Sequence, residues 1–74
     1  MKIKENIVNY HTHYRDENYN IHSIICNYYK GLKPPYEAQH YINSQQKTFI
    51  KTTRKTDVEK FKKQLIKQYN LKEL

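Results

Sequence analysis

A chain of 74 residues is long enough for one small domain and too short to enclose a large hydrophobic core. Its single cysteine, Cys26, excludes an intramolecular disulfide and any zinc motif built from several cysteines. No apolar run is long enough to cross a bilayer, and the opening MKIKENIV lacks the apolar core of a secretory signal. These features predict a soluble, cytoplasmic protein.

The positive charge is concentrated in the last third of the chain. Residues 47–74 contain nine basic and three acidic residues, whereas residues 1–46 contain five basic and four acidic ones, for a formal net charge of +7. A basic region of this kind favours a polyanionic partner, which it would attract without regard to sequence. An ordinary solubilising surface would produce the same excess, so the charge alone leaves both interpretations open.

The first half of the chain predicts a β-hairpin. Residues 7–14 and 19–29 are rich in β-branched and aromatic types and alternate in polarity, as strands do. The polar stretch 15–18 between them is short enough for a hairpin loop. Residues 30–35 contain the only glycine of the chain and two consecutive prolines, and therefore end the hairpin.

The most regular pattern in the sequence predicts an amphipathic helix over residues 57–70. Thr56 and Glu59 match a capping box at its start, and Asn70 is a typical residue at a helix C-terminus. Apolar side chains recur along it at helical spacing. They are Val58, Phe61, Leu65 and Tyr69, with Ile66 on the flank.

A second, shorter hairpin is predicted before the helix, over residues 39–43 and 47–53 around Ser44-Gln45-Gln46. The predicted fold class is therefore α+β. It consists of a small antiparallel sheet of about four strands, in two hairpins, packed by one C-terminal amphipathic helix. Residues 1–74 are predicted to form a single domain.

Three histidines of the first hairpin raise the question of a metal site. Strand alternation places His11 and His13 on one sheet face, and a two-residue turn would bring His22 to the same face. One of the two registers that such a turn allows adds Cys26. The cluster has the donor types of a zinc site, but polar neighbours on a solvent-facing sheet explain the pattern without a metal. We therefore predict no metal and no cofactor, and note that clustered imidazoles would repel one another once protonated near pH 6.

The tyrosines are predicted to divide between the core and the surface. A regular hairpin gives one face with mostly aromatic and aliphatic side chains, on which the helix would pack. That face contains Tyr10, Tyr14, Tyr19, Ile21, Ile25 and Tyr29. The remaining candidates for exposed base stacking or for protein contacts are Tyr28, Tyr36 and Tyr41.

The basic residues before and along the predicted helix form the candidate nucleic-acid-binding set. Flexible cations spaced along a ridge suit phosphate contacts, which carry no sequence preference by themselves. Lys62 is closer to the buried side of the helix, where its aliphatic stem would extend along apolar surface. The set comprises Lys47, Lys51, Arg54, Lys55, Lys60, Lys63 and Lys67.

The stretch YINSQQKTFIKTTRKTDVEKFKKQL, from Tyr41 to Leu65, resembles in its architecture the arm-binding modules at the start of tyrosine recombinases. The likeness consists of a strand pair, a Thr/Lys junction and an amphipathic helix. It implies a sheet-plus-helix arrangement and transfers no functional residue, because the first hairpin has no counterpart in those modules.

An enzyme is not predicted, because the single glycine excludes a glycine-rich phosphate loop and no carboxylate pair falls in a plausible cleft. We expect a small basic nucleic-acid-binding accessory protein, of the type carried by phages or mobile elements. It would contact the phosphates of DNA or RNA through the C-terminal helix and the preceding strand. The alternative is a non-enzymatic inhibitor that docks on a host nucleic-acid-handling enzyme, such as an immune nuclease, by protein–protein contacts. A homodimer is compatible with either role, and a membrane partner is not expected.

Overall fold

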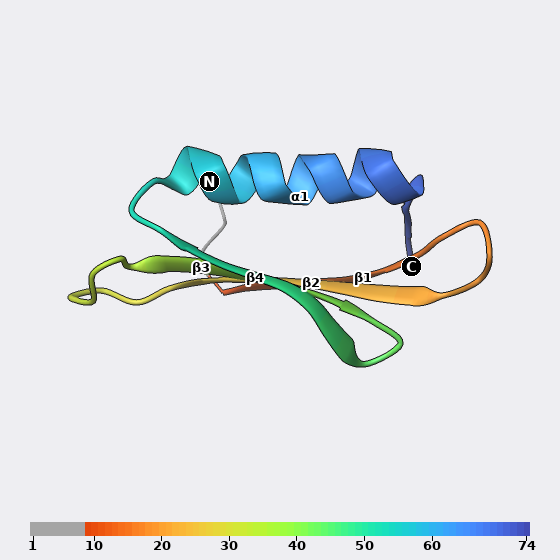
Figure 1. Ribbon diagram of the computed structural model, residues 1–74, viewed down its shortest axis with the longest axis horizontal. Coiled ribbons are helices and arrows are strands. Elements are labelled where there is room, and N and C mark those ends of the chain that lie inside the picture. Colours follow the sequence, from red (N-terminus) through yellow and green to blue (C-terminus); the bar gives the residue numbers. More distant parts are fainter. Residues whose placement is uncertain (1–8) are drawn as a thin grey trace.

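The computed structural model of the protein describes residues 9–74, which form a five-stranded antiparallel sheet and one helix (Figure 1). The sheet order is β4-β3-β2-β1-β5, so four consecutive strands form a meander and the short β5 returns beside β1. The helix lies along one face of the sheet, closest to β3 and β4. No element of residues 9–74 covers the other face of the sheet, which we call the open face. The predicted α+β class is confirmed. The elements are β1 Tyr10–Arg15, β2 Ile21–Tyr28, β3 Tyr36–Ile42, β4 Gln45–Thr52, α1 Lys55–Tyr69 and β5 Lys72–Glu73.

The loop between β1 and β2 is longer than predicted, because it contains the five residues 16–20. Asp16 organises it: the Asp16 Oδ1 atom accepts hydrogen bonds from the backbone N–H groups of Asn18 at 2.9 Å and Asn20 at 3.0 Å. The predicted two-residue turn is therefore wrong. The predicted strand start at residues 7 and 8 lies outside the described residues.

The longer loop sets a register for β2 that differs from the predicted one. Tyr14 pairs with His22 and Tyr10 pairs with Cys26, so these four side chains lie on the helix side of the sheet. Because side chains alternate along a strand, a slip of one residue moves every side chain of β2 to the other face. The predicted core face is correct for β1 and wrong for β2 and its flanks. The residues predicted under the helix that lie elsewhere are Tyr19, Ile21, Ile25 and Tyr29.

β3 and β4 form the second hairpin, with a tighter turn than predicted. The turn is Asn43-Ser44, and its φ angles of 50° and 72° are both positive, as a two-residue type I′ hairpin turn requires. With this turn β3 begins three residues earlier and β4 two residues earlier than the predicted ranges 39–43 and 47–53. Residue-level propensity does not mark such a turn, since Ser is not a usual residue at positive φ.

The α1 helix spans Lys55–Tyr69, two residues earlier at its start than predicted. The capping box is wrong: Arg54 is the N-cap and makes no side-chain capping bond. Thr52 stabilises this end instead, because its hydroxyl donates a 2.6 Å hydrogen bond to Asp57 and accepts one from the Arg54 backbone N–H at 3.1 Å. The predicted end is confirmed, since Asn70 is the C-cap in the left-handed conformation.

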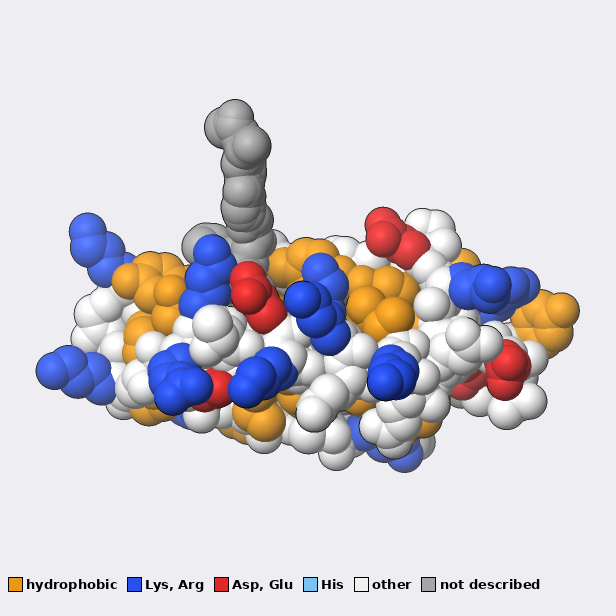
Figure 2. All heavy atoms as spheres, turned by 90° about the horizontal axis from the view of Figure 1, so that it is seen from above, with side chains coloured by type: hydrophobic (Ala, Val, Ile, Leu, Met, Phe, Trp, Pro, Cys, Tyr) orange, Lys and Arg blue, Asp and Glu red, His pale blue; other side chains and the backbone are white. Residues whose placement is uncertain are grey.

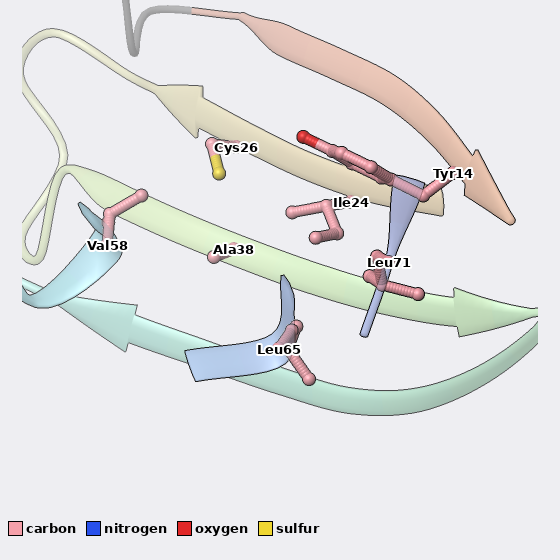
Figure 3. Close-up of a cluster of buried hydrophobic side chains, with 7 residues drawn as sticks. All are labelled: Tyr14, Ile24, Cys26, Ala38, Val58, Leu65 and Leu71. Atoms are coloured by element: carbon pink, nitrogen blue, oxygen red, sulfur yellow. The ribbon is translucent and has the colours of Figure 1, made fainter. Parts of the chain in front are cut away.

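The core lies between α1 and the sheet and is small (Figure 3). Ile24 is fully buried at 0% exposure, and Val58 and Leu65 of α1 are also buried, as predicted for the apolar side of the helix. The predicted Phe61 and Tyr69 are only partly buried and pack around the margin. The buried hydrophobic side chains of residues 9–74 are Tyr14, Ile24, Cys26, Ala38, Val58, Leu65 and Leu71.

Candidate nucleic-acid interface

The outer side of α1 carries a stripe of lysines, which we call the helix stripe: Lys60, Lys63 and Lys67. All three side chains are exposed, and at 100° per residue they project from the side of α1 opposite the buried Val58 and Leu65. Successive members are separated by rises of about 4.5 and 6 Å along the axis. From above the helix, Lys and Arg side chains are spread along the whole face, with acidic side chains at several places among them (Figure 2).

Lys62 is separate from this stripe and faces the sheet. Its Nζ atom lies 4.0 Å from the centroid of the Tyr10 ring on β1, which is a cation–π contact. The aliphatic stem is half-buried, as predicted for a lysine near the apolar side of the helix. Lys62 therefore contributes to packing, and it is not part of the candidate interface.

The other four predicted basic residues lie on β4 and on its junction with α1, which we call the β4 cations: Lys47, Lys51, Arg54 and Lys55. Lys51 pairs in register with Glu37 and therefore lies on the open face, away from the helix stripe. Lys47 lies at a β-bulge, because Thr48 pairs with His40 and Gln46 pairs with Tyr41. The predicted basic set is thus divided between two sides of the molecule, which meet at the β4–α1 junction.

Two acidic residues lie beside the four β4 cations: Glu37 opposite Lys51, and Asp57 beside Arg54. The sequence between Glu37 and Asp57 contains no acidic residue. Asp57 lies 3.8 Å from the exposed Arg54 guanidinium, and such an exposed ion pair is weak. Since β4 is also an edge strand, this acid-poor basic segment lies at the border between the helix side and the open face.

The three tyrosines predicted for stacking lie on different faces. Tyr28 and Tyr36 form a cross-strand pair on the helix side, with ring centroids 4.9 Å apart. Tyr36 packs against the core, so its ring is part of the hydrophobic layer. Tyr41 lies on the open face, where its hydroxyl donates a 2.7 Å hydrogen bond to the Gln39 side-chain oxygen. Of the three, Tyr41 has the position that a stacking role requires.

The open face also presents Phe49, which the sequence analysis did not select. Its ring is 47% exposed, and the Lys51 Nζ atom lies 5.7 Å from the ring centroid. The register places Phe49 beside Gln39, in the same row as Ile25 and His11. The alternation of Lys47-Thr48-Phe49-Ile50-Lys51 contained this signal, because Phe49 and Lys51 must share one face of a strand and Ile50 the other.

The predicted histidine cluster is not present. His11 and His13 share the open face, with ring centroids 4.8 Å apart, but His22 lies on the other face, buried under the helix. Within residues 9–74, no group of three His, Cys, Asp or Glu side chains is arranged to hold a metal ion. Cys26 is buried in the core, and burial raises the pKa of its thiol to about 11, which disfavours the thiolate.

His22 instead belongs to a buried chain of hydrogen bonds. Its Nε2 atom lies 2.7 Å from Asp16 Oδ2 and its Nδ1 atom lies 2.9 Å from His40 Nε2. Tyr69 of α1 packs over both imidazole rings, with centroid distances of 4.8 and 5.4 Å. Because His22 and His40 are 0% and 1% exposed, a ligand in solution does not reach them. The chain joins the first loop, the sheet and the helix, and its role is structural.

A hollow of about 330 Å³ near the C-terminal end of α1 is balanced in charge. Arg15 and Lys72 contribute two positive charges to its wall, and Asp16 and Glu17 contribute two negative ones. The Tyr19 ring, which is 73% exposed, completes the wall, and the Arg15 guanidinium lies 4.8 Å from its centroid. Since the charges cancel, this hollow has no preference for an anion and we do not include it in the interface.

Comparisons with known proteins identify no relative from which a function of this interface could be transferred. No protein-family model, curated protein or solved structure matches the chain. No helix in the described part of the chain has the length and apolarity that a membrane span requires.

Proposed function

We propose that this chain is a small nucleic-acid-binding protein without enzymatic activity, which contacts phosphates through the helix stripe and the β4 cations. The observation that supports it is the arrangement of Lys60, Lys63 and Lys67 along the exposed side of α1. The helix fixes the spacing of the lysine backbone positions before a ligand binds, so only side-chain freedom is lost when the ammonium groups meet a phosphate backbone. Arg54 and Lys55 lie at the N-terminal end of α1 and join the helix stripe to the other β4 cations at the edge of the sheet.

Binding of this kind is driven largely by release of counterions from the nucleic acid. It depends strongly on salt and weakly on sequence, because phosphates are the same at every position. The proposal therefore concerns an accessory protein that coats or holds nucleic acid. We place it in the cytoplasm, where the single buried thiol of Cys26 would stay reduced.

The test is fluorescence anisotropy with labelled DNA and RNA oligonucleotides across a salt series from roughly 50 to 300 mM. The variant Lys60→Gln/Lys63→Gln/Lys67→Gln removes the helix stripe. If each lysine neutralises one phosphate, the slope of log K against log salt should become shallower by about 2–3 on duplex DNA. The affinity of this triple variant for the oligonucleotides near physiological salt should also be lower than that of the wild-type chain.

A matched control separates the helix stripe from net charge. The variant Lys30→Gln/Lys33→Gln/Lys72→Gln removes the same number of positive charges from the β2–β3 loop and from β5. We expect it to retain most of the affinity and of the salt slope. Equal losses in the two triple variants would contradict the assigned surface. Absence of binding at the lowest salt would reject the proposal and favour a protein-docking inhibitor.

A further inference from the structure

We propose that the ligand is a single strand of nucleic acid, whose bases stack on the open face of the sheet against Phe49 and Tyr41 while the β4 cations hold its phosphates. This inference rests on the proposed function and narrows it to a class of ligand. It assigns a second surface to the protein, because the helix stripe and the open face lie on opposite sides of the sheet.

The first step is the arrangement of rings on the open face. Phe49 on β4 lies beside Gln39, and Tyr41 is two residues further along β3 on the same face. A β-bulge separates their two rows of the sheet, so each ring is available to a separate base. His11 and His13 form a separate aromatic pair on β1, because Ile25 and Ser23 of β2 lie between them and β3. The π-faces of Phe49 and Tyr41 can each accept any base.

The second step is the charge beside these rings. Lys51 lies next to Phe49, and Lys47, Arg54 and Lys55 follow the same edge strand into α1. A base stacked on Phe49 would therefore have its phosphates within reach of lysine side chains along β4. This edge has the complementary charge of a phosphate backbone, since it carries four cations and is faced by two acidic residues, Glu37 opposite Lys51 and Asp57 beside Arg54.

Glu37 is the acidic residue nearest to the stacking surface, and its carboxylate is occupied by hydrogen bonds. Its Oε2 atom accepts from the Tyr29 hydroxyl at 3.0 Å, from the Asn27 amide at 3.3 Å and from the Gln39 amide at 3.4 Å. These bonds direct the carboxylate toward the β2 side of the face, away from Phe49 on the edge strand. The amides they hold in place offer hydrogen-bonding groups next to the rings.

The third step distinguishes a single strand from a duplex. Bases in a duplex are stacked on one another, so their faces are not accessible to side-chain rings, whereas unpaired bases can leave the strand and stack on an aromatic surface. Phe49 is nearly half exposed although a more buried position would stabilise the fold. An exposed ring on a cationic edge strand can stack on an unpaired base of a single strand. A duplex offers this ring no accessible base face, so it would contact the edge strand through its phosphates.

The experiment compares Phe49→Ala with the wild-type chain on a fluorescein-labelled dT15 oligonucleotide, a U15 oligonucleotide and a 15-base-pair duplex at one salt concentration. We expect the variant to bind the single strands roughly tenfold or more weakly, as removal of one stacking ring does elsewhere, with little change on the duplex. The salt slope should stay the same, because no phosphate contact is removed. Tyr41→Ala should act in the same direction.

Two further variants keep the outcome interpretable. Tyr19→Ala removes a ring of higher exposure, 73%, at the β1–β2 loop, and should leave affinity unchanged. Phe49→Trp keeps an aromatic ring and introduces the only tryptophan of the chain, so single strands should quench its emission and duplex should not. Binding without quenching, together with unchanged affinity in Phe49→Ala, would overturn the inference and leave the proposed function intact. Loss of all nucleic-acid binding in the wild-type chain would overturn both.

Discussion

At the scale of single residues, the buried chain Asp16–His22–His40 is sensitive to acid. The Asp16 carboxylate only accepts hydrogen bonds, so the Nε2 atom of a neutral His22 carries the proton and its Nδ1 atom accepts from His40 Nε2–H. A further proton on His40 would bind at its Nδ1 atom and leave the hydrogen bond to His22 intact, but it would place a positive charge at a site that is only 1% exposed. Burial first, and then the positive charges of His22 and Lys47, lower the pKa of His40 below its usual value.

This arrangement predicts a loss of stability in mild acid. The unfolded chain binds a proton at His40 more readily than the folded chain, so the free energy of unfolding is highest above the ordinary histidine pKa of about 6.5 and falls below it. The slope should not exceed about 1.4 kcal/mol per pH unit for one proton. Urea unfolding followed by circular dichroism between pH 8 and pH 4.5 measures it.

The variant His40→Gln tests the source of this slope. Glutamine keeps an amide N–H toward His22 and cannot titrate, so the variant should lose the pH dependence in that range. The exposed His11→Gln serves as the control and should keep it. Asp16 acts in a separate, lower window: the hydrogen bond from His22 lowers its pKa to about 2, so its contribution is present above 3.8 and is lost as the pH falls from 3.8 toward 2. An unchanged slope in His40→Gln would contradict this account.

At the scale of elements, the Asn43-Ser44 turn links the two hairpins. The Asn43 side-chain oxygen accepts a 2.9 Å hydrogen bond from the Ile21 backbone N–H, and its amide donates to Asn20 at 2.9 Å. Asn43 is also one of the residue types that tolerate positive φ. Ser44 at φ 72° has no such compensation, because serine pays a steric cost in the left-handed region and makes no side-chain bond within the described residues.

Ser44→Gly is therefore expected to stabilise the protein. Glycine adopts positive φ without steric cost, and Asn-Gly is the preferred type I′ pair. The gain should be about 1 kcal/mol or somewhat less, since glycine also has more freedom in the unfolded chain. Ser44→Val should destabilise, because β-branched side chains fit this region poorly. Thermal and urea unfolding of the two variants measure whether the free energy of unfolding rises or falls. A higher stability of Ser44→Val would contradict the assigned turn.

The hairpins also show how far residue patterns predict the elements of this chain. Alternation located the four strands β1 to β4 but not the short β5, and the helix ended at Asn70 as expected. The β1–β2 register was missed because it depends on a loop in which the Asp16 carboxylate binds two backbone N–H groups and one imidazole. The helix start was missed because Thr52, in the preceding strand, binds Asp57 and takes the place of the expected capping box.

At the scale of the whole molecule, the protein depends on one thin apolar layer. A domain of this size is stabilised by only a few kcal/mol, and its buried side chains come mainly from a single stripe of α1 and alternate positions of the sheet. Ile24 and Ile25 are adjacent in sequence and lie on opposite faces: Ile24 is fully buried under the helix and Ile25 is half-buried on the open face. They report directly on which face forms the core.

Truncating these two isoleucines should give very different results. Ile24→Ala is expected to cost about 2–5 kcal/mol, through lost burial and the cavity left behind, and would leave the domain largely unfolded. Ile25→Ala should cost about 1 kcal/mol or less, because its neighbours are already in contact with solvent. Urea midpoints from circular dichroism compare them. The reverse order would show that the β2 register is wrong.

The sequence by itself determined the four main strands, the helix, the α+β class and the basic character of the C-terminal third, because each depends on local periodicity or on composition. The short β5 was not predicted, because it forms by pairing with β1. Only the tertiary structure decided which side of β2 faces the core, that His22 joins His40 and Asp16 and not His11 and His13, and that Phe49 shares the open face with Tyr41. These relations depend on register between strands. A register is selected by loop geometry and by contacts between residues distant in sequence, and the two-residue periodicity of a single strand carries no information about it.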